Sequence, residues 1–419
     1  MNKDKNKKPP VHSSQFTASR PIPYGKQQIT QEDIEAVVEV LQSDWLTQGP
    51  KITEFEEAFA RYVDAKYAVA VSNGTAALHL CTLALDVKPG DKVITTPVTF
   101  AATANCVRYA GGEVVFADID PETYLLDIRE VEKLLKSAPK GTYKGIIPVD
   151  FAGRVVDLEA FRTLANEYGC WIIEDACHAP GGFFVDSQGQ KQQCGNGNFA
   201  DLAIFSFHPV KHIAAGEGGM ITTNEEKLYH KLRKLRTHGI QQRPELRQFD
   251  HGPWYYEMQE LGFNYRLTDL QAALGISQLT RADEGLKKRK EIASRYYDAF
   301  INMPHITDRN REANVQKPIV NSLSGHAYHL YVVELEKRKE LINHLRDNNI
   351  FAQVHYIPLH LMPYYRQFGW KEGDLPNAEK YYEHCLSLPI YPALTEEEQT
   401  HVISTIKAFG LPPLIRTLR

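Results

Sequence analysis

YAVAVSNGTAAL, residues 67–78, changes from one hydrophobic pattern to another at Gly74. The small and β-branched residues 67–72 predict a buried strand, and residues 75–85, which follow the glycine, predict a helix. The same patterns recur and predict strands at residues 92–96, 113–118, 145–149 and 171–174 and helices at residues 128–135 and 158–168. Because near-continuous apolar strands that alternate with helices form βαβ crossovers, the sequence predicts an α/β protein with a mostly parallel, buried sheet.

Near Leu279 the composition shifts towards charge, and residues 284–300 predict a long charged helix. A strand at 329–335 and a helix at 337–348 follow, which predicts a smaller C-terminal α/β domain. The domain boundaries expected from these changes are an N-terminal tail or arm at 1–28, a large domain at 29–283 and a small domain at 284–419.

The chain of 419 residues has 48 lysines and arginines against 52 aspartates and glutamates, a formal net charge of −4. This balance argues against a nucleic-acid or membrane-surface role, since both usually require a basic excess. Residues 1–14 contain no apolar segment, so we expect a solvated tail and not a secretory signal. The six cysteines are scattered and predict reduced thiols in a cytoplasmic protein. The alternative is a metal site formed by Cys170, Cys177, His178 and Cys194. It is not expected, because the spacing of these residues matches no usual pattern of metal ligands.

The first candidate site lies at the start of the helix predicted after Gly74. Free backbone N–H groups at a helix N-terminus, together with the helix dipole, bind phosphate well. Gly74, Thr75 and Ala76 are therefore candidate phosphate-binding residues. The alternative is an ordinary turn capped by Ser72 or Asn73.

Asp175 directly follows the apolar run WIIE at residues 171–174. Ligands of open α/β sheets bind at the carboxyl ends of the strands, where this carboxylate should lie. An adjacent anion favours the protonated form of a heterocyclic ring nitrogen, so Asp175 is suited to hold such a ring in its electron-withdrawing form. The alternative is that Asp175 only caps a following helix.

Lys211 follows the apolar segment FSFHPV and precedes the glycine-rich turn GEGG at 216–219. A lysine in an apolar setting is costly unless it is paired or deprotonated, and a lowered pKa makes its amine nucleophilic. Ser206, five residues earlier, is placed to bond a phosphate oxygen. The alternative is a lysine whose charged end reaches solvent from a loop.

A phosphate site, a ring-nitrogen carboxylate and an imine-forming lysine, in that order, describe a pocket for pyridoxal 5'-phosphate. Together these residues resemble the DegT/DnrJ/EryC1/StrS family of sugar aminotransferases, from about residue 23 onward. The resemblance implies the fold-type-I architecture, with a mostly parallel seven-stranded sheet and a smaller C-terminal α/β domain. It also implies that Lys211 is the catalytic residue and that pyridoxamine 5'-phosphate forms during the cycle.

Other segments gain roles only from this resemblance. Phe100, in TPVTFAAT at 96–103, corresponds to an aromatic residue that stacks on the cofactor; the alternative is a core residue. Asn264, in GFNYRLTD at 262–269, corresponds to an asparagine that reaches the cofactor phosphate of the neighbouring subunit, which implies a homodimer with shared active sites. His178 is expected to position the cofactor ring or its hydroxyl.

Two further segments, 45–50 and 351–358, are similar to those of aminotransferases in pseudaminic acid biosynthesis. The resemblance implies transfer of an amino group from L-glutamate, which leaves 2-oxoglutarate, to a UDP-linked 4-keto-6-deoxy sugar. The implied nucleotide-sugar-binding residues are Tyr24, Leu46, Thr47, Gln48, Arg266, Gln353, His355 and Tyr356, and packing is the alternative for Tyr24 and His355. Two departures from the family, Cys177 and the run His212–Ala215, weaken the prediction of a particular sugar.

Two rival functions share this fold. A sugar dehydratase with the same cofactor has histidine in place of the lysine, whereas here residue 211 is lysine. A regulatory binding protein would have no need of an imine-forming lysine, and fold alone does not fix function. Both rivals are therefore disfavoured by Lys211.

Overall fold

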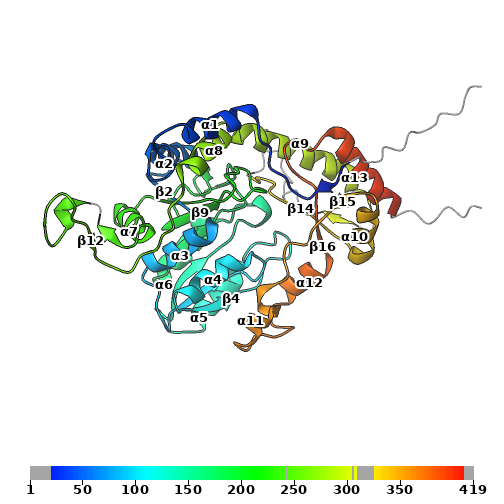
Figure 1. The fold of residues 1–419 in the computed structure, drawn as a ribbon. Helices are drawn as coiled ribbons and strands as arrows, with labels where there is room; N and C mark the ends of the chain where they lie inside the picture. Colours follow the sequence, from blue (N-terminus) through cyan, green and yellow to red (C-terminus); the bar gives the residue numbers. More distant parts are fainter. Residues whose placement is uncertain (1–19, 242, 304–305, 309–324, 410–419) are drawn as a thin grey trace, which may run out of the picture.

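The computed structural model describes residues 20–241, 243–303, 306–308 and 325–409, and is shown in Figure 1. Its main element is a seven-stranded sheet in the order β2-β10-β9-β6-β5-β3-β4. Only β10 runs antiparallel to its neighbours, so the predicted mostly parallel, seven-stranded sheet is confirmed. The strands are β2 (Tyr67–Val71), β3 (Lys92–Thr95), β4 (Glu113–Phe116), β5 (Tyr143–Ile147), β6 (Trp171–Asp175), β9 (Leu202–Ser206) and β10 (Gly219–Thr223).

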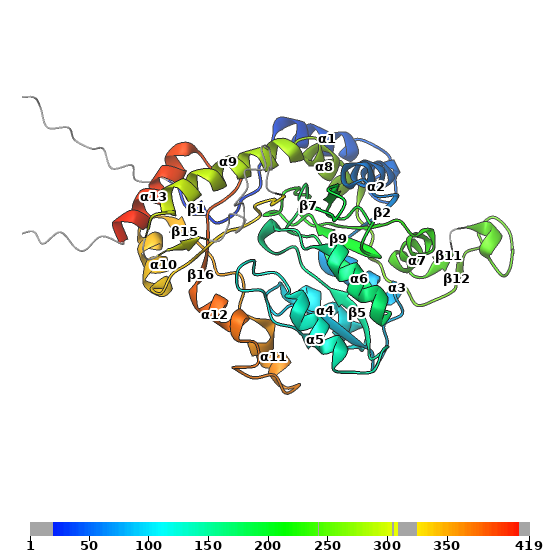
Figure 2. The same cartoon turned by 180° about the vertical axis from the view of Figure 1, so that it is seen from behind.

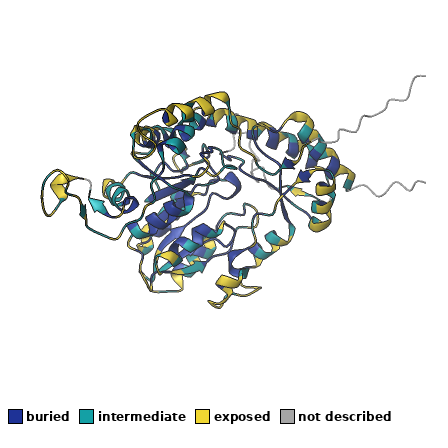
Figure 3. Cartoon of the chain, viewed as in Figure 1, coloured by how far each residue is buried: buried dark blue, intermediate teal, exposed yellow. Residues whose placement is uncertain are grey.

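Helices cover both faces of this sheet, because successive side chains of each buried strand point in opposite directions. In β2, Val69 and Val71 pack in the cluster that includes residues of helices α3, α4 and α7, while Ala68 and Ala70 pack on the other face with α2 and α8. Helices α5 and α6 cover the remainder of that second face. The bounds are α2 (Pro50–Val63), α3 (Gly74–Ala84), α4 (Ala101–Tyr109), α5 (Ile128–Lys136), α6 (Leu158–Tyr168), α7 (Glu226–Arg236) and α8 (Asp269–Leu279). The buried sheet between the two helical layers is visible in Figures 2 and 3.

A second, smaller sheet has the order β13-β14-β16 and packs in a core of its own with α9, α10 and α13. Helix α9 starts beside the first core and ends in the second, and the predicted boundary at 283/284 stays a prediction. The bounds are β13 (Thr307–Asp308), β14 (Tyr331–Glu334), β16 (Cys385–Leu388), α9 (Ala282–Phe300), α10 (Arg338–Asp347), α11 (Pro363–Arg366), α12 (Pro376–His384) and α13 (Glu396–Phe409).

The segment before α1 (Gln31–Leu41) joins the smaller sheet region to the larger one. Its strand β1 (Ile22–Pro23) pairs in parallel with β15 (Ile350–Phe351), and Ile390 N–H donates to the carbonyl of Tyr24. Tyr24 is thereby held next to residues 350–356, which are far away in sequence.

Two hairpins complete the described chain: β7 (Phe183–Val185) with β8 (Lys191–Gln193), and β11 (Ile240–Gln241) with β12 (Glu257–Met258). The second hairpin extends away from the body of the molecule in both Figure 1 and Figure 2.

Most predicted elements are found, with shifted ends. The strand predicted at 145–149 is β5 at Tyr143–Ile147, because Pro148 has no N–H to donate to a ladder. The helix predicted from residue 75 already includes Gly74, and its N-cap is Asn73, whose side chain accepts a hydrogen bond from the N–H of Ala76 at 2.8 Å.

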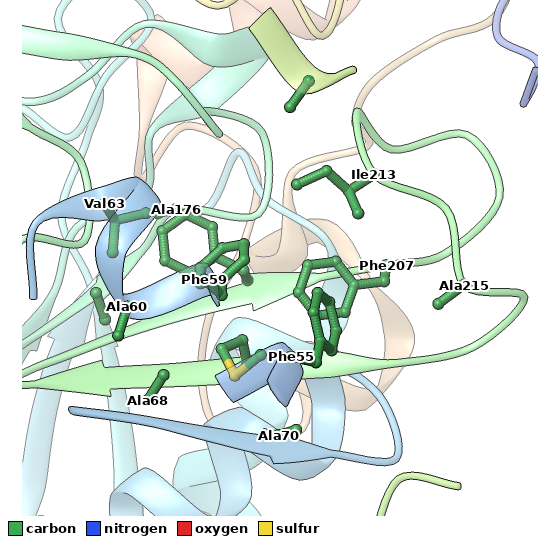
Figure 4. Close-up of a cluster of buried hydrophobic side chains, with 14 of the residues drawn as sticks. Phe55, Phe59, Ala60, Val63, Ala68, Ala70, Ala176, Phe207, Ile213 and Ala215 are labelled. Carbon is green, nitrogen blue, oxygen red and sulfur yellow. The ribbon is translucent and has the colours of Figure 1, made fainter. Parts of the chain in front are cut away.

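The segment that carries Lys211 is anchored in the core (Figure 4). Phe207, Ile213 and Ala215 are buried with Phe55 and Phe59 of α2. Backbone hydrogen bonds from Ala215 N–H to Phe207 O (2.9 Å) and from Phe207 N–H to Gly218 O (2.8 Å) close the loop. Lys211 therefore stands on a loop whose two ends are held by packing and hydrogen bonds.

Candidate active site

A cavity of about 510 Å³ lies at the carboxyl ends of β2, β5, β6 and β9. Its volume is in the usual range for small-molecule sites. The predicted residues that it brings together are Tyr24, Gly74, Thr75, Phe100, Asp175, His178, Ser206, Lys211, His355 and Tyr356. They come from the strand ends of the large sheet, from the N-terminal segment and from the segment after β15, so the cavity is a product of the whole fold.

The N-terminus of α3 forms one end of the cavity. Gly74 and Thr75, the first residues of the helix, line it. Their N–H groups have no carbonyl partner within the helix, because they lie in its first turn. A Cβ placed on Gly74 would lie 3.1 Å from the Cβ of Ser206 and 3.4 Å from its Oγ, so Gly74 lets the helix N-terminus and the hydroxyl of Ser206 lie close together. A hydroxyl and free helix N–H groups around such a space fit a phosphate group.

Asp175 is almost fully buried at the end of β6 and faces the cavity. Its Oδ2 accepts a hydrogen bond from Thr103 Oγ1 at 2.7 Å, and its Oδ1 accepts one from the N–H of Cys177 at 3.2 Å. Thr99 and Thr103 hydroxyls lie 2.8 Å apart, which completes a chain of hydroxyls behind the carboxylate. The residues after β6 form turns and no helix, so the helix-cap alternative for Asp175 is wrong.

Lys211 lines the same cavity as Asp175 and Cys177. Burial lowers the pKa of its ammonium group, and the nearby Cys177 and Asp175 partly oppose this effect. A lysine that loses its proton more readily than usual is a better nucleophile. The solvent-reaching alternative does not fit a lysine in this enclosed position.

His178 is buried and neutral. Its Nδ1 accepts a hydrogen bond from the N–H of Ala152 at 3.3 Å, which leaves the ring proton on Nε2, 3.4 Å from the hydroxyl of Tyr356. Burial first, and then the charge of Lys211, lowers the pKa of His178 well below its usual value. The imidazole can thus donate a hydrogen bond towards a ligand without adding charge.

Aromatic residues form the mouth of the cavity. Phe100 is 62% exposed and its ring centroid lies 6.4 Å from that of Tyr356, so the alternative that Phe100 is a core residue is wrong. The rings of Tyr24 and His355 pack 4.9 Å apart while both residues line the cavity. The Nδ1 of His355 lies 2.9 Å from Ser387 Oγ, and burial lowers the pKa of His355 to about 4.

Other predicted site residues lie outside the cavity lining of this single chain. Ala76 uses its N–H for Asn73, and Gln353 is exposed beside Ser387. The predicted nucleotide-sugar residues Leu46, Thr47, Gln48 and Arg266 also lie outside this lining. Leu46 and Thr47 are tied to the segment that follows Arg266, by a Thr47–Thr268 bridge and by the hydrogen bond from Asp269 N–H to Leu46 O at 3.1 Å. Asn264 is exposed, in a bridge with Thr237.

Sequence reasoning did not predict several residues of the cavity lining, and Thr103 and His329 are two of them. Thr103 could have been found, because it stands four residues after Thr99 in the segment that was expected to carry the stacking aromatic residue. His329 lies close to the imidazole of His178, with 4.3 Å between the ring centroids. No local pattern indicated His329, because it belongs to the segment leading into β14, far along the chain.

These residues fit pyridoxal phosphate, because the cavity lining offers helix N–H groups and a hydroxyl, a carboxylate and an amine. The hydroxyl and N–H donors match the phosphate, the carboxylate matches a protonated ring nitrogen, and the amine matches an aldehyde. Among the described residues, no group of three or more His, Cys, Asp or Glu side chains is placed to hold a metal ion. In the same part of the chain, no helix is long and apolar enough to span a membrane.

Comparison with known proteins agrees with this geometry. A family profile described as the DegT/DnrJ/EryC1/StrS aminotransferase family matches residues 27–407. Over 394 residues, 92% of this chain and 96% of the relative, the chain is 41% identical to the spore coat polysaccharide biosynthesis protein SpsC of Bacillus subtilis. It is 36% identical to the UDP-4-amino-4,6-dideoxy-N-acetyl-beta-L-altrosamine transaminase of Campylobacter jejuni, with 92% of this chain and 96% of that protein covered. The solved structure of Helicobacter pylori PseC, an aminotransferase involved in the biosynthesis of pseudoaminic acid, matches with a TM-score of 0.80 and 30% identity, over 93% of this chain and 99% of that one.

Proposed function

Because the chain belongs to the DegT/DnrJ/EryC1/StrS aminotransferase family, we propose that it transfers the amino group of L-glutamate to carbon 4 of a UDP-linked 4-keto-6-deoxy sugar. That the chain is a pyridoxal-phosphate-dependent sugar aminotransferase follows from the family and its relatives. The proposed substrate is UDP-2-acetamido-2,6-dideoxy-β-L-arabino-hex-4-ulose, and the proposed pathway is pseudaminic acid biosynthesis. The observation that carries the proposal is the single cavity in which Lys211, Asp175 and the α3 N-terminus meet.

Each residue of the cavity has a separate role in binding the cofactor. Pyridoxal phosphate, when bound, carries the amino group between the two substrates and withdraws electrons from the reacting carbon. The N–H groups of Gly74 and Thr75 and the hydroxyl of Ser206 bind its phosphate. Asp175, oriented by Thr103, holds the proton on the ring nitrogen. Phe100 would cover the ring, and the Nε2 proton of His178 would be available to its hydroxyl.

Lys211 then moves the proton. Its Nζ would take the proton from the α-carbon of the donor and deliver it to the cofactor carbon that bears the transferred nitrogen. In the second half-reaction it would take a proton from that cofactor carbon and deliver it to carbon 4 of the sugar. Burial keeps the pKa of this amine below its usual value, so the unprotonated form needed for proton removal is more populated. Tyr24, His355 and Tyr356 line the cavity on the side from which the sugar would enter.

We propose that the active enzyme is a homodimer. The arm formed by the second hairpin exposes large apolar side chains that a monomer would leave in water: Leu246, Phe249, Trp254, Tyr256, Met258 and Leu261 are 49–78% exposed. Asn264 lies just after this arm, and a partner subunit would bring it to the neighbouring phosphate site. We also propose a cytoplasmic location, since all six cysteines are free thiols.

A substrate panel tests the proposed reaction. The purified protein is incubated with L-glutamate and, separately, UDP-, GDP- and dTDP-linked 4-keto-6-deoxy sugars, and each product is identified by mass spectrometry and NMR. We expect a 4-amino sugar from the UDP-linked β-L-arabino-hex-4-ulose and 2-oxoglutarate in equal amount. Amination of another epimer, or of a sugar linked to another nucleotide, would instead assign the enzyme to a bacillosamine, legionaminic or perosamine type of pathway.

Mixing two inactive variants tests the shared site. Lys211→Ala and Asn264→Ala dimers are each expected to be impaired, but a hybrid dimer has one site with both lesions and one with neither. After subunit exchange of an equal mixture, about a quarter of the wild-type sites should be intact, since hybrids make up half of the dimers. Activity that never rises above that of the separate variants would place Asn264 in the same chain's site or in none.

A further inference from the structure

Two carboxyl groups that the proposed reaction does not use, Asp150 and Glu174, are buried at neighbouring strand ends. Asp150 is 0% and Glu174 1% exposed. Asp150 lies just beyond β5, and Glu174 is the residue of β6 that precedes Asp175. Because side chains alternate along a strand, Glu174 points to the face of the sheet opposite to that of Asp175.

In each carboxyl group, one oxygen accepts a hydrogen bond and the other has no hydrogen-bond donor. Asp150 Oδ1 accepts from the N–H of Val156 at 2.9 Å, and Glu174 Oε2 accepts from the N–H of Gly195 at 2.8 Å. Among the described residues, Asp150 Oδ2 and Glu174 Oε1 are both buried and have no donor. The two carboxyl groups are close enough for each to affect the pKa of the other.

Two ionised carboxylates in this position would each leave a buried acceptor unsatisfied and would repel each other. A single proton removes both problems, because one carboxyl group becomes a donor to the other. Burial, and then the neighbouring carboxyl, raises the pKa of Asp150 well above its usual value, and burial raises that of Glu174. Asp175 and the thiols of Cys177 and Cys194 are the other titratable groups beside the pair.

The pair is tied to Asp175 through the backbone. The N–H of Asp150 donates to the carbonyl of Asp175 at 3.0 Å, and the N–H of Asp175 donates to the carbonyl of Pro148 at 2.9 Å. Val149 and Asp175 form a parallel bridge between these two bonds. A shift of either carboxyl group would therefore move the strand end that carries Asp175.

We propose that Asp150 and Glu174 share one proton and act as a singly charged positioning pair, which holds Asp175 in place and adds negative potential behind it. That potential favours a proton on the ring nitrogen that Asp175 faces, as any nearby anion does. This second part rests on the proposed function, because it needs Asp175 to be the partner of the ring nitrogen.

Amide substitutions separate the charge from the hydrogen bond. In Asp150→Asn or Glu174→Gln, the new amide N–H₂ replaces the shared proton as donor and the remaining carboxylate keeps the negative charge. In the double variant the amides still bond to each other, but the charge is lost. We expect both single variants to stay close to wild-type kcat and the double variant to lose about tenfold in kcat with little change in KM, as expected for one charge at this depth.

The pH dependence of unfolding tests the proton itself, whatever the activity. Unfolded carboxyl groups have a pKa near about 4, so above about pH 5 the folded wild type binds one proton more than the unfolded chain. Its folding equilibrium constant should then fall about tenfold per pH unit from this pair, until the folded pair loses its proton. Each single variant should lose this contribution, while the exposed control Glu372→Gln should keep it.

Three results would overturn parts of the proposal in distinguishable ways. A pH slope that is the same in wild type and both single variants would mean that no proton is shared. A lost slope together with wild-type kcat in a folded double variant would remove the link to Asp175. If the double variant does not fold, the ultraviolet–visible absorption of the bound cofactor is followed with rising pH in the single variants. They have no shared proton to lose, so they should lack the change that the wild type and Glu372→Gln show when the pair loses its proton. A pH profile equal to that of Glu372→Gln would remove the link. Failure of the proposed function would show instead as a wild type without transaminase activity, and it would leave the pH slope unaffected.

Discussion

Lys211→Ala is expected to lower transamination by on the order of 10⁴-fold, the upper end of what one proton-transferring group contributes. The variant lacks both the amine that bonds the cofactor aldehyde and the base that moves the proton, and no other lysine lines the cavity described here. We expect the visible absorption of the lysine-bound cofactor to disappear as well. Steady-state release of 2-oxoglutarate and the absorption spectrum measure the two effects.

Two control variants separate chemistry from folding. Lys287→Ala removes an exposed lysine of α9 and should keep wild-type activity and colour. Lys211→Arg keeps a cation in the cavity but has no free amine, and it should be as inactive as the alanine variant. If Lys211→Ala retained a tenth of the wild-type rate, the role of Lys211 would have to be abandoned.

Asp175→Asn is expected to lower kcat by about 10²–10³-fold, the usual effect of removing one preorganised electrostatic group from an active site. The asparagine oxygen can keep the hydrogen bond from the N–H of Cys177, and its N–H₂ can donate to the hydroxyl of Thr103, so the side chain can keep its place while the charge is lost. A neutral partner no longer holds the proton on the ring nitrogen, and electron withdrawal from the reacting carbon weakens. Single-turnover rates with L-glutamate measure this step directly.

Thr103→Val is the matched control for Asp175. It keeps the carboxylate and removes one of its hydrogen bonds, so we expect a loss of only about threefold to tenfold, the worth of one ordinary hydrogen bond. A larger effect for Thr103→Val than for Asp175→Asn would contradict the electrostatic role of Asp175 and would make orientation the dominant factor.

The order of strands and helices could be predicted because each buried strand has a continuous apolar run and each helix an apolar stripe. The same local patterns placed Gly74, Asp175, Ser206 and Lys211 at strand ends and turns. The end of β5 was misplaced because Pro148 is apolar enough to extend the pattern but cannot donate to the ladder.

The substrate side of the cavity could not be predicted from local patterns. Tyr24 is about 300 residues from His329 and Tyr356 along the chain, and the pairing of β1 with β15 brings its segment to theirs. Leu46, Thr47, Gln48 and Arg266 were predicted from resemblance, and the single chain leaves them outside the cavity lining.

By itself, then, the amino-acid sequence determined which backbone turns could bind phosphate, which strand end would carry a carboxylate and which lysine would stand in apolar surroundings. Such features depend on hydrophobic period, turn residues and chain order, all of which are local. Only the tertiary structure decided that Thr103 orients Asp175, that His178 is neutral with its proton on Nε2, and that Asp150 and Glu174 meet. These facts depend on burial and on distances between side chains from different strands, which no local stretch of sequence contains.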